Sequence, residues 1–213
     1  MPAVSWGLVV PVKRLALAKS RLSSFGDAAR QDLALAFALD VVAAGRWAGS
    51  VEQVLVVTDD RRATEALSEA GARVVGDVPD AGLNPAIEHG ASLLPVELGV
   101  ATVSADLPAL RPMDIDGALG AVPLGGRGFV VDTAGSGTTL LAAAPGASLA
   151  PAYGIASRSV HRASGAVELP AAAGLRLDVD TPEDLQLALR LGVGTATAAV
   201  VRRLALSHSP PRP

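Results

Sequence analysis

Short apolar runs alternate with stretches of helical spacing along the first half of the chain. Four runs rich in valine and alanine are typical of buried strands: residues 7–12, 51–57, 72–75 and 100–104. Three segments between them carry apolar side chains at helical spacing: residues 29–47, 63–70 and 84–94. Strands that alternate with helices form βαβ units around a mainly parallel sheet. The pattern therefore predicts an α/β fold.

The second half of the chain has shorter apolar runs and more turn residues. Four strands are predicted here, the first two joined by a turn at 134–137: residues 129–132, 139–141, 167–169 and 175–179. A helix is expected to begin at Thr181, an N-cap residue followed by proline, and to end near Leu191. A last helix is expected over 195–206, and residues 207–213 are expected to be a disordered tail. Without a visible linker or repeat, residues 1–206 are expected to form a single domain.

Composition limits the setting of the protein but indicates no function. The chain of 213 residues is half hydrophobic, which suffices for a large core, and only 3% aromatic, so the core must be aliphatic. Cysteine is absent, which excludes disulfides and thiolate metal sites and favours a reducing cytoplasm. The first ten residues show no signal-peptide pattern. A net charge of -3 and interrupted apolar runs give no support for a nucleic-acid partner or a membrane span.

Basic side chains gather directly after the first predicted strand. Lys13 and Lys19 are the only lysines among 18 basic residues, and both lie here with Arg14 and Arg21. Ligands of doubly wound sheets bind beyond the carboxyl ends of strands, and lysine is a compact charge suited to phosphate. We interpret the segment as a triphosphate cradle; the alternative is a solvated basic loop. It contains no P-loop or dinucleotide-binding glycine pattern, which disfavours an ordinary kinase, GTPase or dehydrogenase.

Aspartates follow two other predicted strands. Asp106 comes after the run 100–104, where a carboxylate can hold Mg²⁺ over a triphosphate; the alternative is a turn or helix-capping aspartate. Asp178 and Asp180 end the predicted strand 175–179, whose alternation would direct both carboxylates to one side. Asp180 has the alternative role of capping the following loop. Two acidic strand ends and a basic loop match the needs of phosphoryl-type transfer, which requires no protein nucleophile.

Three further polar features each have two interpretations. Backbone N–H groups of residues 135–139 would form an anion nest or belong to a hairpin turn. Asn84 would read the edge of a base or cap the next helix, and the local sequence favours the cap. His161 would border a site or lie on a helix surface. No histidine pair has zinc-helix spacing, and no esterase elbow is present.

Seven short motifs occur in a fixed order along the chain. They are Pro11-Val12-Lys13 through Ala18-Lys19-Ser20-Arg21-Leu22, Val57-Thr58-Asp59-Asp60, Gly82-Leu83-Asn84, Ala105-Asp106-Leu107-Pro108-Ala109-Leu110, Gly135-Ser136-Gly137-Thr138-Thr139-Leu140, Ser164-Gly165-Ala166 and Asp178-Val179-Asp180-Thr181-Pro182. Each motif is weak, but the ordered set resembles the guanylyltransferases of coenzyme F420 biosynthesis, which act on 2-phospho-L-lactate or phosphoenolpyruvate. The resemblance runs from about residue 7 to 200.

The resemblance implies a three-layer glycosyltransferase-A-like nucleotidyltransferase fold, with GTP as donor and Mg²⁺ as cofactor. The phosphate of the small acid would attack the α-phosphate, and pyrophosphate would leave. By position, the resemblance assigns three sets of residues. The metal would be held by Asp106 and Asp178, with Asp180 as a helper. The acid substrate would be bound by Thr138, Gly154 and Ser157. The nucleotide would be bound by Lys13, Lys19, Arg21 and Asn84. Lys13, Lys19 and Asp106 would be the catalytic residues.

The acceptor and the setting of the reaction are further expectations. An Arg- and Ala-rich, Lys-poor composition is typical of high-GC actinobacterial genomes, whose family members are associated with phosphoenolpyruvate; no residue separates it from 2-phospho-L-lactate. The resemblance also implies that the product is handed to the next enzyme of the pathway. The alternatives are a nucleotidyltransferase for a sugar phosphate or molybdopterin-type acceptor, and a non-catalytic GTP-binding module. The sequence predicts no oligomeric state.

Overall fold

The computed structural model describes residues 4–78 and 80–207. Seven strands form one sheet in the order β3-β2-β1-β4-β6-β5-β7. Their bounds are β1 (Trp6–Pro11), β2 (Val51–Val57), β3 (Arg73–Val75), β4 (Gly99–Val103), β5 (Arg127–Val131), β6 (Thr138–Ala143) and β7 (Val167–Glu168). Of these strands, only β6 runs antiparallel to its neighbours, β4 and β5. The predicted mainly parallel sheet is therefore confirmed.

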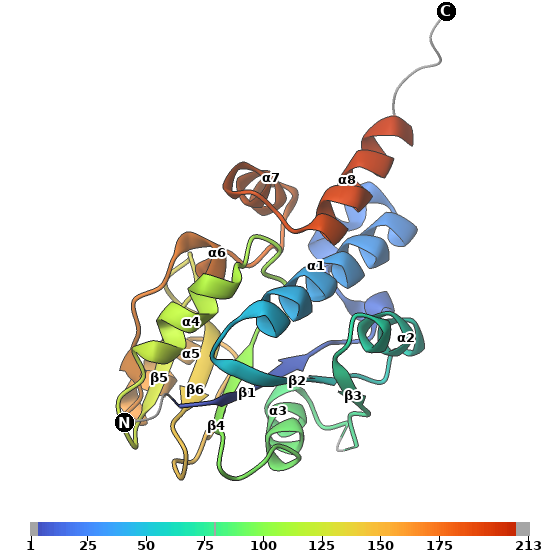
Figure 1. Cartoon of the computed structure of the whole chain (residues 1–213). Coiled ribbons are helices and arrows are strands. Elements are labelled where there is room, and N and C mark those ends of the chain that lie inside the picture. The colour runs from blue at the N-terminus through green and yellow to red at the C-terminus, as the bar shows by residue number, and fades with distance from the viewer. Residues whose placement is uncertain (1–3, 79, 208–213) are drawn as a thin grey trace, which may run out of the picture.

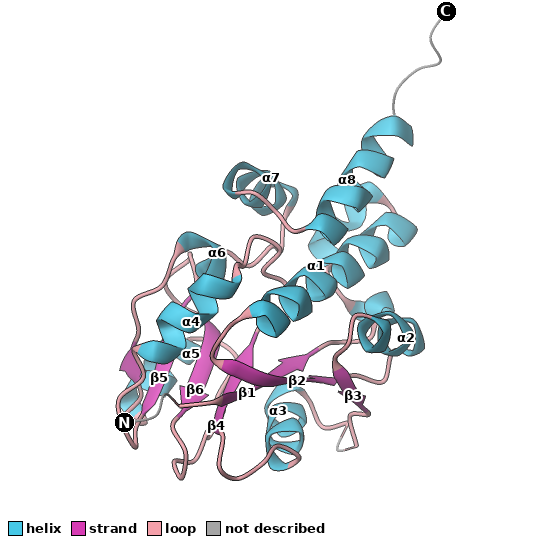
Figure 2. Cartoon of the chain, in the orientation of Figure 1, coloured by secondary structure: helices cyan, strands magenta, loops and turns pink. Residues whose placement is uncertain are grey.

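Helices cover both faces of this sheet (Figures 1 and 2). Their bounds are α1 (Asp27–Trp47), α2 (Arg61–Glu69), α3 (Leu83–Ser92), α4 (Pro112–Gly120), α5 (Ser157–Ala163), α6 (Ala173–Arg176), α7 (Pro182–Leu191) and α8 (Thr195–Ser207). Two 3-10 turns, η1 (Leu15–Leu17) and η2 (Ser20–Phe25), follow β1. Figure 1 shows α1, α2 and α4 above the sheet and α3 below it, so the fold has three layers. No helix within the described ranges is long and apolar enough to span a membrane.

The sheet is buried on both faces because its central strands are apolar at successive positions. In β1, Leu8 and Val10 pack in the cluster that contains the α1 side chains, while Val9 packs towards α3. This is why the strand is a continuous apolar run instead of an alternating one. The close seating of α3 depends on Gly90, since a Cβ there would lie 2.7 Å from Val57 and 2.8 Å from Val9.

The strand expected over residues 175–179 is wrong. Residues 173–176 form the short helix α6, and residues 177–180 are an extended segment without strand pairing. Leu175, Leu177 and Val179 do alternate, but they pack into two different core clusters and form no ladder. Asp178 and Asp180 therefore do not sit on a strand, and their placement has another cause, described below.

Of the other predictions of local structure, one helix start is confirmed, two helices were missed and one boundary is wrong. The capped start of α7 is confirmed, because Thr181 Oγ1 accepts a hydrogen bond from the Asp184 N–H at 3.2 Å. The helices α4 and α5 were not predicted. The tail expected over 207–213 is wrong at Ser207, which ends α8, and its remaining residues lie outside the described part.

Candidate active site

A cavity lies where the connections of the sheet diverge. From β1 the chain order leads to β2 and β3 on one side, whereas β4 lies on the other. The loops after β1 and β4 therefore part at their carboxyl ends, the position at which open α/β sheets bind ligands. The cavity between them has a volume of about 470 Å³. Its polar lining residues include Lys13, Lys19, Arg21, Ser104, Asp106 and Asp180.

The loop after β1 keeps its shape without a glycine because a buried arginine holds it. The guanidinium of Arg30, on α1, donates to the carbonyl oxygens of Leu15, Ala16 and Ala18, at 3.0 Å for Ala16. Asp60 accepts the N–H of Leu15 at 2.8 Å. The sequence interpretation missed the arginine. Its one signal was a charge on a helix face that is otherwise apolar.

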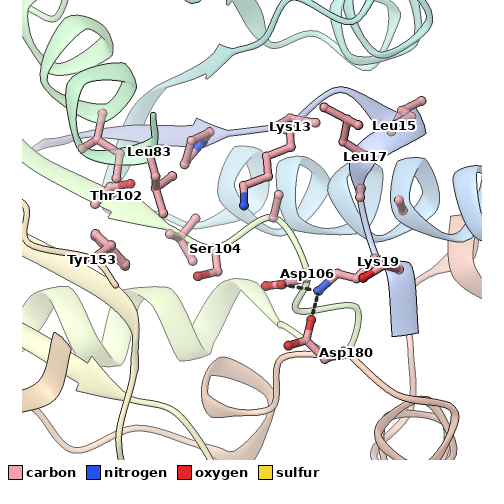
Figure 3. Close-up of a pocket in the computed structure, with 18 of the residues that line it drawn as sticks. Lys13, Leu15, Leu17, Lys19, Leu83, Thr102, Ser104, Asp106, Tyr153 and Asp180 are labelled. Carbon is pink, nitrogen blue, oxygen red and sulfur yellow. Dashed lines mark hydrogen bonds and ion pairs between the residues drawn. The ribbon is translucent and has the colours of Figure 1, made fainter. Parts of the chain in front are cut away.

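Lys19 holds the two acidic segments together (Figure 3). Its ammonium lies 2.5 Å from Asp106 Oδ2 and 2.7 Å from Asp180 Oδ1. Its backbone is left-handed, with φ of 53°. Burial alone would lower the pKa of Lys19, but the charges and hydrogen bonds of Asp106 and Asp180 together outweigh it and raise the pKa. The lysine is therefore firmly cationic.

Other basic side chains extend the positive charge of the cavity. Figure 3 shows Lys13 reaching from the end of β1 into the cavity above Asp106. Arg21 lies 3.7 Å from Asp180 Oδ2. Arg14 turns instead towards Asp59, at 3.7 Å, and Asp80, at 3.9 Å. The structure thus brings Lys13, Lys19 and Arg21 to the predicted cradle, while Arg14 belongs to its outer edge.

The segment that carries Asp178 and Asp180 is tied to the loop after β4. The N–H of Val179 donates to the carbonyl oxygen of Asp106 at 2.9 Å. Burial, with the charge of Asp106 as the next cause, raises the pKa of Asp178 to about 6. Asp106 Oδ1 is buried and has no partner among the described residues. The three predicted metal residues are therefore neighbours. One oxygen of Asp106 is unpartnered, and Asp178 has no ion pair among the described residues.

The three carboxylates do not form a ready metal cluster. Among the described residues, no three acidic or histidine side chains are arranged to hold a metal ion. The ammonium of Lys19 lies between Asp106 and Asp180, where it satisfies one oxygen of each. The donor chemistry fits Mg²⁺, which prefers a few carboxylate oxygens and water. An ion that binds Asp106 Oδ2 or Asp180 Oδ1 would have to displace the lysine.

The residues assigned to the acid substrate lie beside the cavity. The buried hydroxyls of Thr138 and Ser157 are 3.2 Å apart, and the Gly154 carbonyl accepts the Ser157 N–H at 3.3 Å. Gly154 has φ of 145°, which favours glycine. Tyr153, next to it, lines the cavity. The structure brings the three residues into one group, and their binding role stays a prediction.

Two polar features have partners that the sequence did not indicate. The Asn84 amide receives the Tyr153 N–H at 2.8 Å and donates to the Tyr153 carbonyl at 3.0 Å. The favoured helix-cap interpretation of Asn84 is wrong, since Gly82 is the N-cap of α3. The suggested anion nest is already filled: the N–H groups of Ser136 and Gly137 both donate to Asp132, at 2.9 Å.

Comparison with known proteins shows which sequences this chain resembles. The sequence model of the family described as guanylyl transferase CofC like matches residues 7–213. A phosphoenolpyruvate guanylyltransferase of Streptomyces coelicolor is 53% identical over 210 residues, covering 96% of this chain and 99% of the relative. One of Streptomyces scabiei is 54% identical over 211 residues, covering 94% and 98%.

Solved structures show the same fold at low sequence identity. A nucleotidyl transferase of Methanothermobacter overlays with a TM-score of 0.61 at 19% identity, over 88% of this chain and 97% of that one. The expected three-layer nucleotidyltransferase fold is therefore confirmed.

Proposed function

The chain belongs to the family of CofC-like guanylyl transferases, and from that membership we propose that it transfers the GMP of GTP to the phosphate of phosphoenolpyruvate. A phosphate oxygen of the acid attacks the α-phosphorus, the bond from that phosphorus to the bridging oxygen breaks, and pyrophosphate leaves with the electron pair. The observation that carries the proposal is the charge arrangement in the cavity. Lysine and aspartate side chains from the ends of β1 and β4 meet where a triphosphate would lie.

Mg²⁺ is proposed as the cofactor, held by Asp106 and Asp178, with Asp180 as a third ligand. Two features support this assignment. Oδ1 of Asp106 is buried and unpartnered, although Lys19 holds Oδ2 of the same carboxylate, and burial, with the charge of Asp106 as the next cause, raises the pKa of Asp178. When bound, the ion would supply positive charge to the triphosphate and the departing pyrophosphate. Lys19 holds Oδ2 of Asp106 and Oδ1 of Asp180, so an ion that uses these two oxygens replaces its ammonium.

The cationic side chains neutralise the donor. Lys13 is exposed and extends into the cavity, so it can reach phosphate oxygens without breaking an ion pair recorded among the described residues. Lys19 can bind the same phosphates when its ammonium leaves Asp106 and Asp180. Arg21 adds a planar guanidinium donor at the rim of the cavity. Fixed positive charges of this kind stabilise the charge that develops in phosphoryl transfer. No protein nucleophile takes part.

Base recognition is proposed near the amino end of α3. Leu83 and Ile87 line the cavity on that side. Asn84 is adjacent, but its amide is engaged with the Tyr153 backbone. We propose that Asn84 supports the guanine pocket by fixing the position of Tyr153.

The reaction is tested by pyrophosphate release with Mg²⁺ and GTP. Parallel reactions contain phosphoenolpyruvate, 2-phospho-L-lactate, a sugar phosphate or no acceptor, with ATP as the control donor. Release with GTP and phosphoenolpyruvate alone supports the proposal, and preference for 2-phospho-L-lactate corrects the acceptor. Chelation of the metal before assay tests the cofactor. Because the product is expected to pass to the next pathway enzyme, the reaction is repeated with that enzyme present. Absence of pyrophosphate release in every condition refutes the proposed reaction.

A further inference from the structure

His161, on α5, is fully buried and contacts the group of residues assigned to the acid substrate. Its Nδ1 lies 2.9 Å from Thr138 Oγ1, and its Nε2 accepts the backbone N–H of Ala152 at 3.0 Å. The rings of Phe129 and Tyr153 enclose the imidazole, with centroids 5.9 Å and 5.3 Å away. The histidine is therefore no helix-surface residue, and both of its nitrogens are used.

These contacts determine where the imidazole proton lies. A backbone N–H can only donate, so Nε2 must be the unprotonated nitrogen that accepts from Ala152. The proton of the neutral ring is then on Nδ1, from which it donates to Thr138. Burial, followed by the charge of Arg127, lowers the pKa of His161 to about 4, which keeps the ring neutral at physiological pH.

The Thr138 hydroxyl receives a second donor. Ser157 Oγ donates to Thr138 Oγ1 at 3.2 Å. A hydroxyl has two acceptor lone pairs and one proton. With both lone pairs occupied by His161 and Ser157, the Thr138 proton is left for a third partner. An anionic oxygen, carboxylate or phosphate, is the partner that such a donor suits.

The segment before Gly154 is held at two successive residues. The Ala152 N–H is held by His161, and the Tyr153 N–H by Asn84. Gly154 follows directly. One buried side chain thus controls both the hydroxyl of Thr138 and the course of the backbone that leads to Gly154.

We propose that His161 is a positioning residue for the acid substrate, which orients the Thr138 hydroxyl through Nδ1–H and fixes the 152–154 backbone through Nε2. The inference rests on the proposed function, because it assumes that Thr138 and Gly154 bind the acceptor. It assigns the residue no contact with the substrate and no role in proton transfer. Loss of the Nδ1–H bond to Thr138 alone is therefore expected to change the affinity for the acid and not that for GTP.

Two substitutions separate the two hydrogen bonds. The amide of asparagine reaches the position of Nδ1, so His161→Asn keeps a donor to Thr138 and loses the acceptor for Ala152. Glutamine reaches the position of Nε2, so His161→Gln keeps the acceptor and loses the donor. We expect His161→Gln to raise the KM for the acid about tenfold, the loss of roughly one hydrogen bond to a charged partner, while the KM for GTP stays within about twofold.

A packing control removes the contact between the Phe129 and His161 rings and leaves both hydrogen bonds of His161 in place. Phe129→Leu loosens the wall beside the imidazole and should lower the melting temperature while leaving the ratio of the two KM values unchanged. If His161→Gln changes both KM values equally, or behaves as Phe129→Leu does, the residue is merely structural and the proposal is overturned.

The proton position is measured independently of activity. In protein labelled with ¹⁵N-histidine, the His161 signal is identified by its absence in His161→Asn. We expect a protonated Nδ1 and an unprotonated Nε2 from about pH 6 to 8, where an unperturbed histidine would titrate near 6.5. An Nε2–H tautomer, or titration in this range, would overturn the inference. Because this readout needs no turnover, a wild-type enzyme inactive with every acid would refute the proposed reaction without altering this result.

Discussion

Replacement of Lys19 by methionine tests whether the ammonium of Lys19 occupies the position between Asp106 and Asp180 that the proposed metal ion would take. Methionine keeps the aliphatic bulk and removes only the charge. The backbone at this position has φ of 53° and is strained for either side chain, so the substitution leaves that cost unchanged. The loss of stability then reports the interaction of the ammonium with Asp106 and Asp180.

The expected size follows from the two ion pairs. A hydrogen bond to a charged group contributes about 1.5–3 kcal/mol when its partner is buried. The Asp106 side chain is 26% exposed, so its bond to Lys19 contributes nearly the full value to stability. Asp180 is 47% exposed, and its bond contributes little because solvent screens it. We expect a decrease of about 2–3 kcal/mol in the free energy of unfolding. For a chain of this length, that corresponds to a melting temperature lower by about 5–10 °C.

Magnesium should stabilise the variant more than the wild type. In the wild type, an ion that binds Asp106 and Asp180 must first displace the ammonium of Lys19. The variant carries no such competitor, so the same magnesium concentration gives a larger stabilisation by mass action. The assay is thermal unfolding of both proteins in chelator and in a magnesium series, without nucleotide.

Lys13→Met is the matched control. Lys13 lines the same cavity but has no ion pair or hydrogen bond recorded among the described residues, so its loss should cost little stability and leave the magnesium response as in the wild type. Equal destabilisation by the two methionine variants would contradict the reasoning. So would a magnesium response in Lys19→Met no larger than in the wild type.

Three further outcomes are expected. Because the pKa of Asp178 is raised from 3.8 to about 6, its contribution to stability is present below the lower value and is lost as pH rises through the upper one; Asp178→Asn should therefore flatten the fall in melting temperature across this window, and an unchanged slope would refute the assignment. Arg30→Met removes the donors that hold the carbonyls of the loop after β1 and should lower stability by about 2–4 kcal/mol and raise the KM for GTP; a normal KM would separate the loop from nucleotide binding. Asp40 accepts the N–H groups of Ala196 and Thr197 at the start of α8, so Asp40→Ala should cost about 1–2 kcal/mol in urea unfolding with both KM values unchanged.

Local periodicity predicted most of the central fold because the central strands are buried on both faces and α1 is buried along most of its length. The rule that ligands bind at strand ends then placed Lys13, Lys19 and Asp106 correctly in one cavity. The same reasoning failed at residues 175–179, since alternating burial in an extended segment has the same pattern whether or not the segment pairs with a strand. Periodicity describes what a side chain packs against, and it carries no information on backbone partners.

The polar contacts could not be predicted for a related reason. Asn84 and Tyr153, like His161 and Thr138, meet only because distant segments pack together. A short polar side chain has the same local sequence signature whether it caps its own helix or binds a loop elsewhere. Local sequence therefore favoured the cap for Asn84, whereas tertiary packing gave its amide two backbone partners at once.

The acidic site is assembled by backbone contacts that depend on the whole fold. Burial and, after it, the negative charge of Asp106 raise the pKa of Asp178, so the two carboxylates repel each other. Their segments nevertheless stay together, because the Val179 N–H donates to the Asp106 carbonyl and Leu177 and Val179 are buried in the core. Lys19 offsets part of this repulsion through its ion pair with Asp106. We therefore expect the ammonium of Lys19 and the proposed Mg²⁺ to occupy this position in turn, while the loop held by Arg30 keeps Lys19 within reach of both carboxylates.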